Sequence, residues 1–149
     1  MKTFLVPVDF SPITDRVIAS ALDFARAFKG QVVLLHVVQA PVIASAEYAL
    51  PADVIQEAVT VSKNASQNKM AAYTEYFTKE GIPCTCQTLI GAPVPLIRDE
   101  SAKPGTDFII MGSHGHGKLY DFLVGSTASG VIKQAKCGVI IIPPLDKHG

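Results

Sequence analysis

Short apolar runs alternate with segments of helical periodicity along almost the whole chain. Five runs have the length and composition of buried strands, and they cover residues 4–8, 32–38, 84–90, 107–111 and 139–142. Apolar residues recur at helical spacing in four segments between them, at about 13–28, 54–77, 93–101 and 127–135. Consecutive parallel strands need a crossover about as long as a helix, and that crossover is right-handed. The alternation therefore predicts one α/β domain over residues 1–149, an open five-stranded parallel sheet with helices on both faces.

Individual residues indicate where the predicted helices begin and end. Ser11 can cap the first helix, Pro12 suits its first helical position, and Gly30 predicts its end. Gly81 predicts the end of the second helix. Gly130 lies inside the fourth helix, where a glycine costs about 1 kcal/mol relative to alanine but permits close packing. The apolar face predicted for the second helix consists of Val54, Ile55, Ala58, Val61, Ala65, Ala72, Tyr73, Tyr76 and Phe77.

Charge and hydropathy limit the classes of partner. Thirteen basic residues balance thirteen acidic ones, so no long-range field attracts nucleic acid or an anionic membrane. No apolar stretch reaches the roughly 20 residues of a membrane helix, and Asp9 comes too early for the core of a secretion signal. Cys84 and Cys86 are expected on one face of a strand, buried or half-buried, and with Cys137 they lack the further ligands of a metal site. We expect a cytoplasmic protein with reduced thiols.

A glycine-rich segment follows the fourth predicted strand, at the place where open α/β sheets bind ligands. It reads Gly-Ser-His-Gly-His-Gly-Lys over residues 112–118, and Gly125, Ser126 and Thr127 open the next helix. Glycines let backbone N–H groups approach phosphates, often with positive φ. A helix N-terminus adds unpaired N–H groups and the positive end of a dipole, and the two hydroxyls add donors. The segment therefore predicts a cradle for phosphate groups.

Two familiar phosphate signatures nearly fit this segment. Residues 112–118 satisfy G-x-x-x-x-G-K, but Leu119 stands where a P-loop needs Ser or Thr for its metal. The dinucleotide pattern G-x-G-x-x-G also fails, because Tyr120 stands in place of its third glycine. Neither signature explains the spacing.

A third spacing fits throughout: Gly112-x2-Gly115-x9-Gly125-Ser126. With it, the chain resembles the ATP-binding branch of the universal stress protein family, and the resemblance covers the whole chain. The segments that carry it are Val-Pro-Val-Asp-Phe-Ser at 6–11, Leu-Leu-His-Val at 34–37 and Ile-Met-Gly-Ser-His-Gly at 110–115. The resemblance implies a Rossmann-like sheet of order 3-2-1-4-5, similar to that of the adenine nucleotide alpha hydrolases. Asp9 and Gly112 would then follow adjacent strands at the reversal point.

The resemblance also implies a nucleotide site and its ligands. The positions matching the adenine end are Pro7, Asp9 and Val37. Those matching the ribose and first phosphate are Met111 and Gly112. Those matching the phosphate cradle are Gly115, Gly125, Ser126 and Thr127. ATP is the implied cofactor, accompanied by Mg²⁺ or Mn²⁺, although no carboxylate pair dedicated to the ion is visible.

Several features outside that set keep more than one interpretation. His114, His116 and Lys118 could touch phosphates, but a solvated loop tip is favoured because no acid or base partner can be placed beside them. Residues 40–50 form either a lid or an interface. The strand from Val139 to Ile142 is a strongly β-forming edge that needs covering. The resemblance implies that it pairs with its copy in a two-fold homodimer.

Three functions compete. The leading one is a binding module, in which ATP occupancy alters a dimer surface that protein partners recognise. The second is an enzyme with slow ATP hydrolysis or autophosphorylation, which needs an oriented water and stabilised charge. No base is evident, and Arg16, Arg26 and Arg98 fall on predicted helices away from the loop. The third class, adenylating or sulfur-transferring ATPases, carries an S-G-G-x-D-S type loop that is absent after the first strand.

Overall fold

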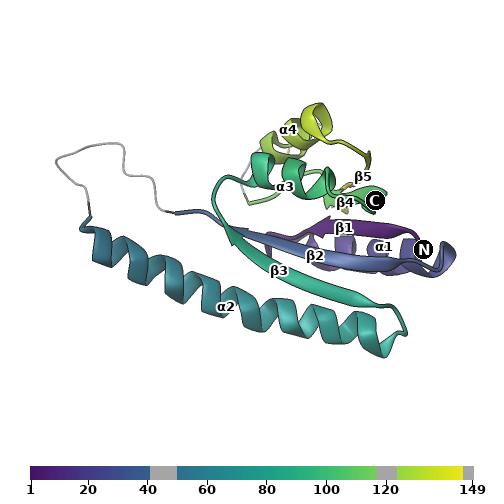
Figure 1. The fold of residues 1–149 in the computed structure, drawn as a ribbon, viewed down its shortest axis with the longest axis horizontal. Coiled ribbons are helices and arrows are strands. Elements are labelled where there is room, and N and C mark those ends of the chain that lie inside the picture. Colours follow the sequence, from purple (N-terminus) through teal and green to yellow (C-terminus); the bar gives the residue numbers. More distant parts are fainter. Residues whose placement is uncertain (41–49, 117–123, 146–149) are drawn as a thin grey trace.

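The structure is a computed structural model that describes residues 1–40, 50–116 and 124–145 (Figure 1). Its centre is a parallel sheet whose strands lie in the order β3-β2-β1-β4-β5. The strands are β1 (Thr3–Pro7), β2 (Gln31–Val38), β3 (Cys84–Ile90), β4 (Phe108–Gly112) and β5 (Gly138–Ile142). The predicted fold class and strand order are confirmed.

Helices cover both faces of the sheet because the central strands are buried on both sides. They are α1 (Thr14–Ala27), α2 (Ala52–Lys79), α3 (Pro93–Ser101) and α4 (Ser126–Gln134). Alternate residues of β1 point to opposite faces. Phe4 belongs to a buried cluster with residues of α1 and α2, whereas Leu5 belongs to one with residues of α3 and α4. Figure 1 shows α3 and α4 together on one side of the sheet.

The side on which the chain adds strands to the sheet changes at β1. From β1 it builds outward to β2 and β3, and then crosses to the other side for β4 and β5. β1 and β4 pair directly, with Phe4 opposite Phe108 and Leu5 opposite Ile109. The carboxyl ends of β1 and β4 therefore form the switch point, where ligands of open α/β sheets bind.

The start of α1 differs from the prediction. The helix begins at Thr14, and Ser11 lies in a turn whose carbonyl accepts a hydrogen bond from the Thr14 N–H at 3.0 Å. The Ser11 side chain does not cap the helix. Instead, the Asp9 carboxylate accepts the Ser11 backbone N–H at 3.0 Å. The N-cap of α1 is Ile13, which has no side-chain cap, and Asp9 instead stabilises the preceding turn by bonding the backbone two residues on.

The buried face of α2 also differs. Its buried residues are Val59, Ser66, Met70 and Phe77, and of these only Phe77 was predicted. Val61 is 63% exposed. Apolar residues occur around most of this helix, so two stripes compete, and contact with β2 and β3 selects the one at 59, 66, 70 and 77. Ser66 fits that stripe because its hydroxyl donates to the Ser62 carbonyl at 2.8 Å.

Of two smaller predictions, the one for the cysteines is partly wrong and the one for Gly130 is confirmed. Cys84 is half-buried as expected, but Cys86 is exposed, because β3 is an edge strand. Gly130 does permit close packing: a Cβ there would lie 2.8 Å from Cγ2 of Val94, on α3.

Candidate functional site

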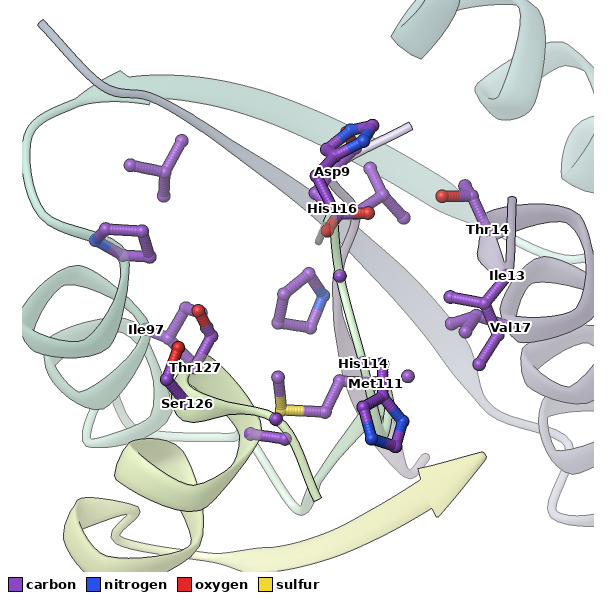
Figure 2. Close-up of a pocket in the computed structure, with 18 of the residues that line it drawn as sticks. Asp9, Ile13, Thr14, Val17, Ile97, Met111, His114, His116, Ser126 and Thr127 are labelled. Atoms are coloured by element: carbon purple, nitrogen blue, oxygen red, sulfur yellow. The ribbon is translucent and has the colours of Figure 1, made fainter. Parts of the chain in front are cut away.

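A cleft with a cavity volume of about 220 Å³ opens at the carboxyl ends of β1 and β4. The nine residues predicted to bind the nucleotide come from four separate segments of the chain. All nine line this cleft: Pro7, Asp9, Val37, Met111, Gly112, Gly115, Gly125, Ser126 and Thr127. Figure 2 shows Asp9 and Met111 between the α1 side chains and those of α3 and α4.

At three glycines of the cleft, neighbouring atoms lie close to the point where a side chain would begin. A Cβ on Gly112 would lie 2.9 Å from Cγ2 of Ile13, and one on Gly125 would lie 3.1 Å from the Ser113 carbonyl oxygen. A Cβ on Gly115 would overlap the Asp9 carboxylate. None of the three has a positive φ, so the left-handed backbone that glycines in phosphate loops often adopt does not occur at these positions. Close approach of neighbouring groups, rather than chain conformation, restricts side chains at these positions.

Asp9 lies at the junction of the two strand ends. One carboxylate oxygen accepts the Ser11 N–H, and the other lies against Gly115. The first turn after β1 and the loop after β4 therefore touch at this side chain. A ligand that enters between them must displace or hydrogen-bond the Asp9 carboxylate.

The N-terminus of α4 forms one wall of the cleft. Gly125 is its N-cap, and the Gly125 N–H donates to the Ser113 carbonyl at 2.6 Å, which joins the helix to the end of β4. No side chain caps the helix, and no acidic residue lies in its first turn. The N–H groups of the first turn and the positive end of the dipole are thus available to an anion. Ser126 and Thr127, at the N-terminus of α4, add their hydroxyl groups to the same wall of the cleft (Figure 2).

Two histidines of the glycine-rich segment line the cleft. The Nε2–H of His116 donates to the Asp9 carbonyl at 2.6 Å, which sets the tautomer of this ring when it is neutral. His114 is half-buried, and its Nδ1 lies 2.8 Å from the hydroxyl of buried Ser113. The solvated loop tip expected from the sequence is wrong for His114 and incomplete for His116, which is exposed but bonded. Lys118, Leu119 and Tyr120 lie outside the described residues, as does most of the segment 40–50.

Other lining residues were missed by the sequence prediction. Gln39 and Pro93 follow the ends of β2 and β3, and the rule that ligands bind at strand ends would have found them. Ile13 and Thr14 come from the start of α1 and carried no comparable signal. Among the described residues, the buried hydroxyls of Ser11 and Thr14 have no hydrogen-bond partner. Thr14 therefore adds an unused donor and acceptor to the cleft wall.

The described lysine and arginine side chains lie outside the cleft. Arg26 pairs with Glu80, Arg98 contacts Asp99 and Gln134, and none of the described lysines or arginines lines the cleft. In the same parts of the chain, no group of three or more His, Cys, Asp and Glu side chains could hold a metal ion. No described helix is long and apolar enough to cross a membrane. An anion in the cleft would rely on backbone N–H groups, hydroxyls and the α4 dipole.

A cleft at the switch point of an open parallel sheet, walled by glycines and a helix N-terminus, is typical of α/β nucleotide- and phosphate-binding proteins. The chain belongs to the universal stress protein family, whose pattern matches residues 1–143. It is 30% identical to universal stress protein A homolog 1 of Coxiella burnetii over 143 residues, 95% of each chain.

Two solved proteins extend the comparison. The chain is 30% identical over 156 residues to universal stress protein MJ0577 of Methanocaldococcus jannaschii, covering 95% of this chain and 94% of the relative. The structure of MJ0577 gives a TM-score of 0.85 at 27% identity over 98% of both chains. The universal stress protein of Archaeoglobus fulgidus in complex with dAMP gives 0.64 at 21% identity, covering 95% of this chain and 98% of that one. The last likeness shows a shared fold.

Proposed function

We propose that this universal stress protein binds ATP in the cleft and acts as a nucleotide-dependent regulatory module. The observation that carries the proposal is the convergence of nine residues, from four segments, on one cleft at the switch point. In the proposed complex, the adenine lies by Pro7, Asp9 and Val37, and the ribose and first phosphate by Met111 and Gly112. The remaining phosphates lie at Gly115, Gly125, Ser126 and Thr127.

The chemistry of the cleft supports a phosphate-containing ligand. The three glycines leave no room for side chains, so a phosphate oxygen can approach the backbone closely. The first turn of α4 offers N–H donors without a competing carboxylate. The cavity of about 220 Å³ is below the roughly 300–1,000 Å³ of typical small-molecule sites. A whole triphosphate would therefore extend beyond this cavity toward the mouth of the cleft.

In the proposed complex, a divalent cation accompanies ATP and is bound to its phosphates. The described residues offer no metal-binding cluster, so Mg²⁺ or Mn²⁺ would be held mainly by phosphate oxygens and water. The same scarcity of charge supports binding over turnover, because phosphoryl transfer needs a group that neutralises the transition state. The hydroxyls and N–H groups described above bind and orient phosphates. A dAMP complex of a protein with the same fold agrees with an adenine nucleotide as ligand.

We also propose a homodimer that forms through β5, in a cytoplasmic protein. β5 is an edge strand, and Val139, Ile140 and Ile141 are each only partly buried. An exposed, flat, apolar edge invites pairing with a second strand. Sedimentation equilibrium at micromolar concentration should give twice the chain mass of 15.9 kDa. A mass of one chain under those conditions would contradict the dimer without touching the proposal for ATP.

The nucleotide proposal is tested by calorimetric titration of the purified chain with ATP·Mg²⁺ and by denaturing mass spectrometry of any co-purified nucleotide. Gly115→Val with Gly125→Val should abolish binding, because the new side chains fill the space beside Asp9 and the Ser113 carbonyl. Gly138→Ala is a matched control, since its Cβ crowds the Phe108 ring, 2.8 Å away, at the other end of the sheet. A folded double variant with unchanged affinity would contradict the assignment.

A further inference from the structure

Phe10 has a backbone conformation that a bulky residue rarely adopts. Its φ is 59°, in the left-handed region, where a side chain other than glycine or asparagine costs free energy. The residue directly follows Asp9, which contacts Gly115 in the cleft. Strain of this kind persists only where surrounding contacts hold it.

Three side chains surround the half-buried Phe10 ring. The His36 ring centroid lies 4.4 Å away, and the Tyr73 ring is stacked at 6.4 Å with an interplanar angle of 6°. The Lys69 ammonium lies 4.8 Å from the ring centroid. Aromatic contacts and a cation over a ring face are both attractive. We call Phe10, His36, Lys69 and Tyr73 the Phe10 clasp.

The same clasp bonds the chain on both sides of Phe10. The Nδ1–H of His36 donates to the Val8 carbonyl at 2.7 Å, at the end of β1. The Tyr73 hydroxyl donates to the Asp15 carboxylate at 2.9 Å, in the first turn of α1. Burial, followed by the bond to Asp15, raises the pKa of Tyr73 to about 12, so the hydroxyl keeps its proton at neutral pH. Asp9 is therefore held between two fixed points.

Lys69 and Tyr73 are one helical turn apart on α2, and neither lines the cleft. α2 runs along the outer layer of the molecule, beside β3 (Figure 1). Its N-terminal half carries few buried residues. The helix thus touches the turn that carries Asp9 without touching the proposed nucleotide.

We propose that Phe10 is a positioning residue that holds Asp9 in the cleft, and that α2 controls nucleotide affinity through Lys69 and Tyr73. This inference rests on the proposed ATP binding. A purely structural role predicts that loss of the clasp lowers thermal stability alone. A positioning role predicts weaker binding even where stability is kept, because the turn must then be ordered by the ligand.

Two substitutions of Phe10 separate these roles. Phe10→Ala removes the ring and keeps the strained φ, whereas Phe10→Gly removes both, since glycine adopts this φ freely. Phe10→Gly should therefore melt above Phe10→Ala, yet both should bind ATP·Mg²⁺ roughly tenfold more weakly in calorimetric titration. If affinity follows melting temperature across the pair, the positioning role is wrong.

Substitutions of Tyr73 test the contribution of α2. Tyr73→Ala should weaken binding severalfold from outside the cleft. Tyr73→Phe, which keeps the stacked ring and loses only the bond to Asp15, should show a smaller loss. Phe28→Ala is the matched control: it loses an aromatic contact with Phe4, at 6.0 Å, beyond the far end of α1. That variant should lose stability and keep its affinity.

The unaltered chain separates the two proposals. If it binds no ATP, the proposed function fails and this inference fails with it. If it binds ATP but Tyr73→Ala and either folded Phe10 variant bind equally well, only the inference is overturned. Tyr73→Ala alone decides the matter should both Phe10 variants fail to fold.

Discussion

Contacts between single side chains decide the shape of the cleft. Gly115 leaves room for the Asp9 carboxylate, and Gly112 leaves room for Ile13. His116 adds a bond from the glycine-rich segment to the backbone of Asp9. Within the described part of the loop after β4, a packing contact at Gly115 and a hydrogen bond from His116 join it to the turn after β1.

His116→Ala removes that hydrogen bond. A net hydrogen bond contributes about 0.5–1.5 kcal/mol, so the dissociation constant for ATP should rise roughly two- to tenfold. The increase should come from faster dissociation, measured by displacement of a fluorescent ATP analogue. His116→Gln supplies a side-chain N–H donor and should recover part of the loss. Equal dissociation rates for all three chains would show that the bond plays no part in binding.

Residue-level prediction was most specific where a general rule applied. The switch-point rule pointed to the carboxyl ends of β1 and β4, and the nine residues that the resemblance supplied line one cleft there. Their binding of a nucleotide stays a prediction. The roles of His114 and His116 could not be predicted, because their partners are the Ser113 hydroxyl and a backbone carbonyl of Asp9. Contacts to a distant backbone leave no trace in local sequence.

Helices and strands were predictable to the degree that their patterns were unambiguous. Residues 93–101 were expected as a helix and form α3 with those bounds, because Pro93 marks its start. The buried stripe of α2 was not predictable, since its apolar residues allow two faces and only tertiary contact chooses between them. In α4, by contrast, a single residue was informative: Gly130 indicated close packing, and it lies against Val94 of α3.

Gly130→Ala should destabilise the protein although alanine favours helices. Alanine gains about 1 kcal/mol in propensity, but its Cβ would meet a stiff β-branched side chain, and overpacking costs about 1–3 kcal/mol. Urea unfolding should therefore show a net loss of up to about 2 kcal/mol. Val94→Ala in the same chain relieves the clash, so the two changes together should cost less than their sum. Simple additivity would contradict the proposed contact.

The molecule as a whole is joined at both ends of the β1–β4 pair. At the carboxyl ends lies the cleft, and at the amino ends the Asp107 carboxylate accepts the Thr3 N–H at 2.8 Å. This backbone bond, with a smaller contribution from Lys2, lowers the pKa of Asp107 below its ordinary value of 3.8. The two halves of the sheet, β3-β2-β1 and β4-β5, are thereby tied together at residues far apart in sequence.

The lowered pKa predicts a pH dependence of stability. A carboxyl group with a depressed pKa in the folded state stabilises the fold above its unfolded pKa, near 3.8, and loses that contribution as pH falls through the folded value. Asp107→Asn should therefore melt below the unaltered chain at pH 7, and the two melting temperatures should converge as the pH falls through the folded pKa of Asp107, below 3.8. Glu57→Gln, an exposed change on α2, serves as a control that should leave the pH profile unchanged. A constant difference at every pH would contradict the prediction.

The contact between Gly115 and Asp9 makes the side-chain sizes tolerated at these two positions depend on each other. The Cβ of any side chain at position 115 would overlap the present position of the Asp9 carboxylate, so that carboxylate would have to move. In a library randomised at both sites and selected for folding, sizes at 9 and 115 should anticorrelate before any ligand is added. Selection for nucleotide would then act on what remains, so engineering a new specificity in this cleft has to redesign both positions together.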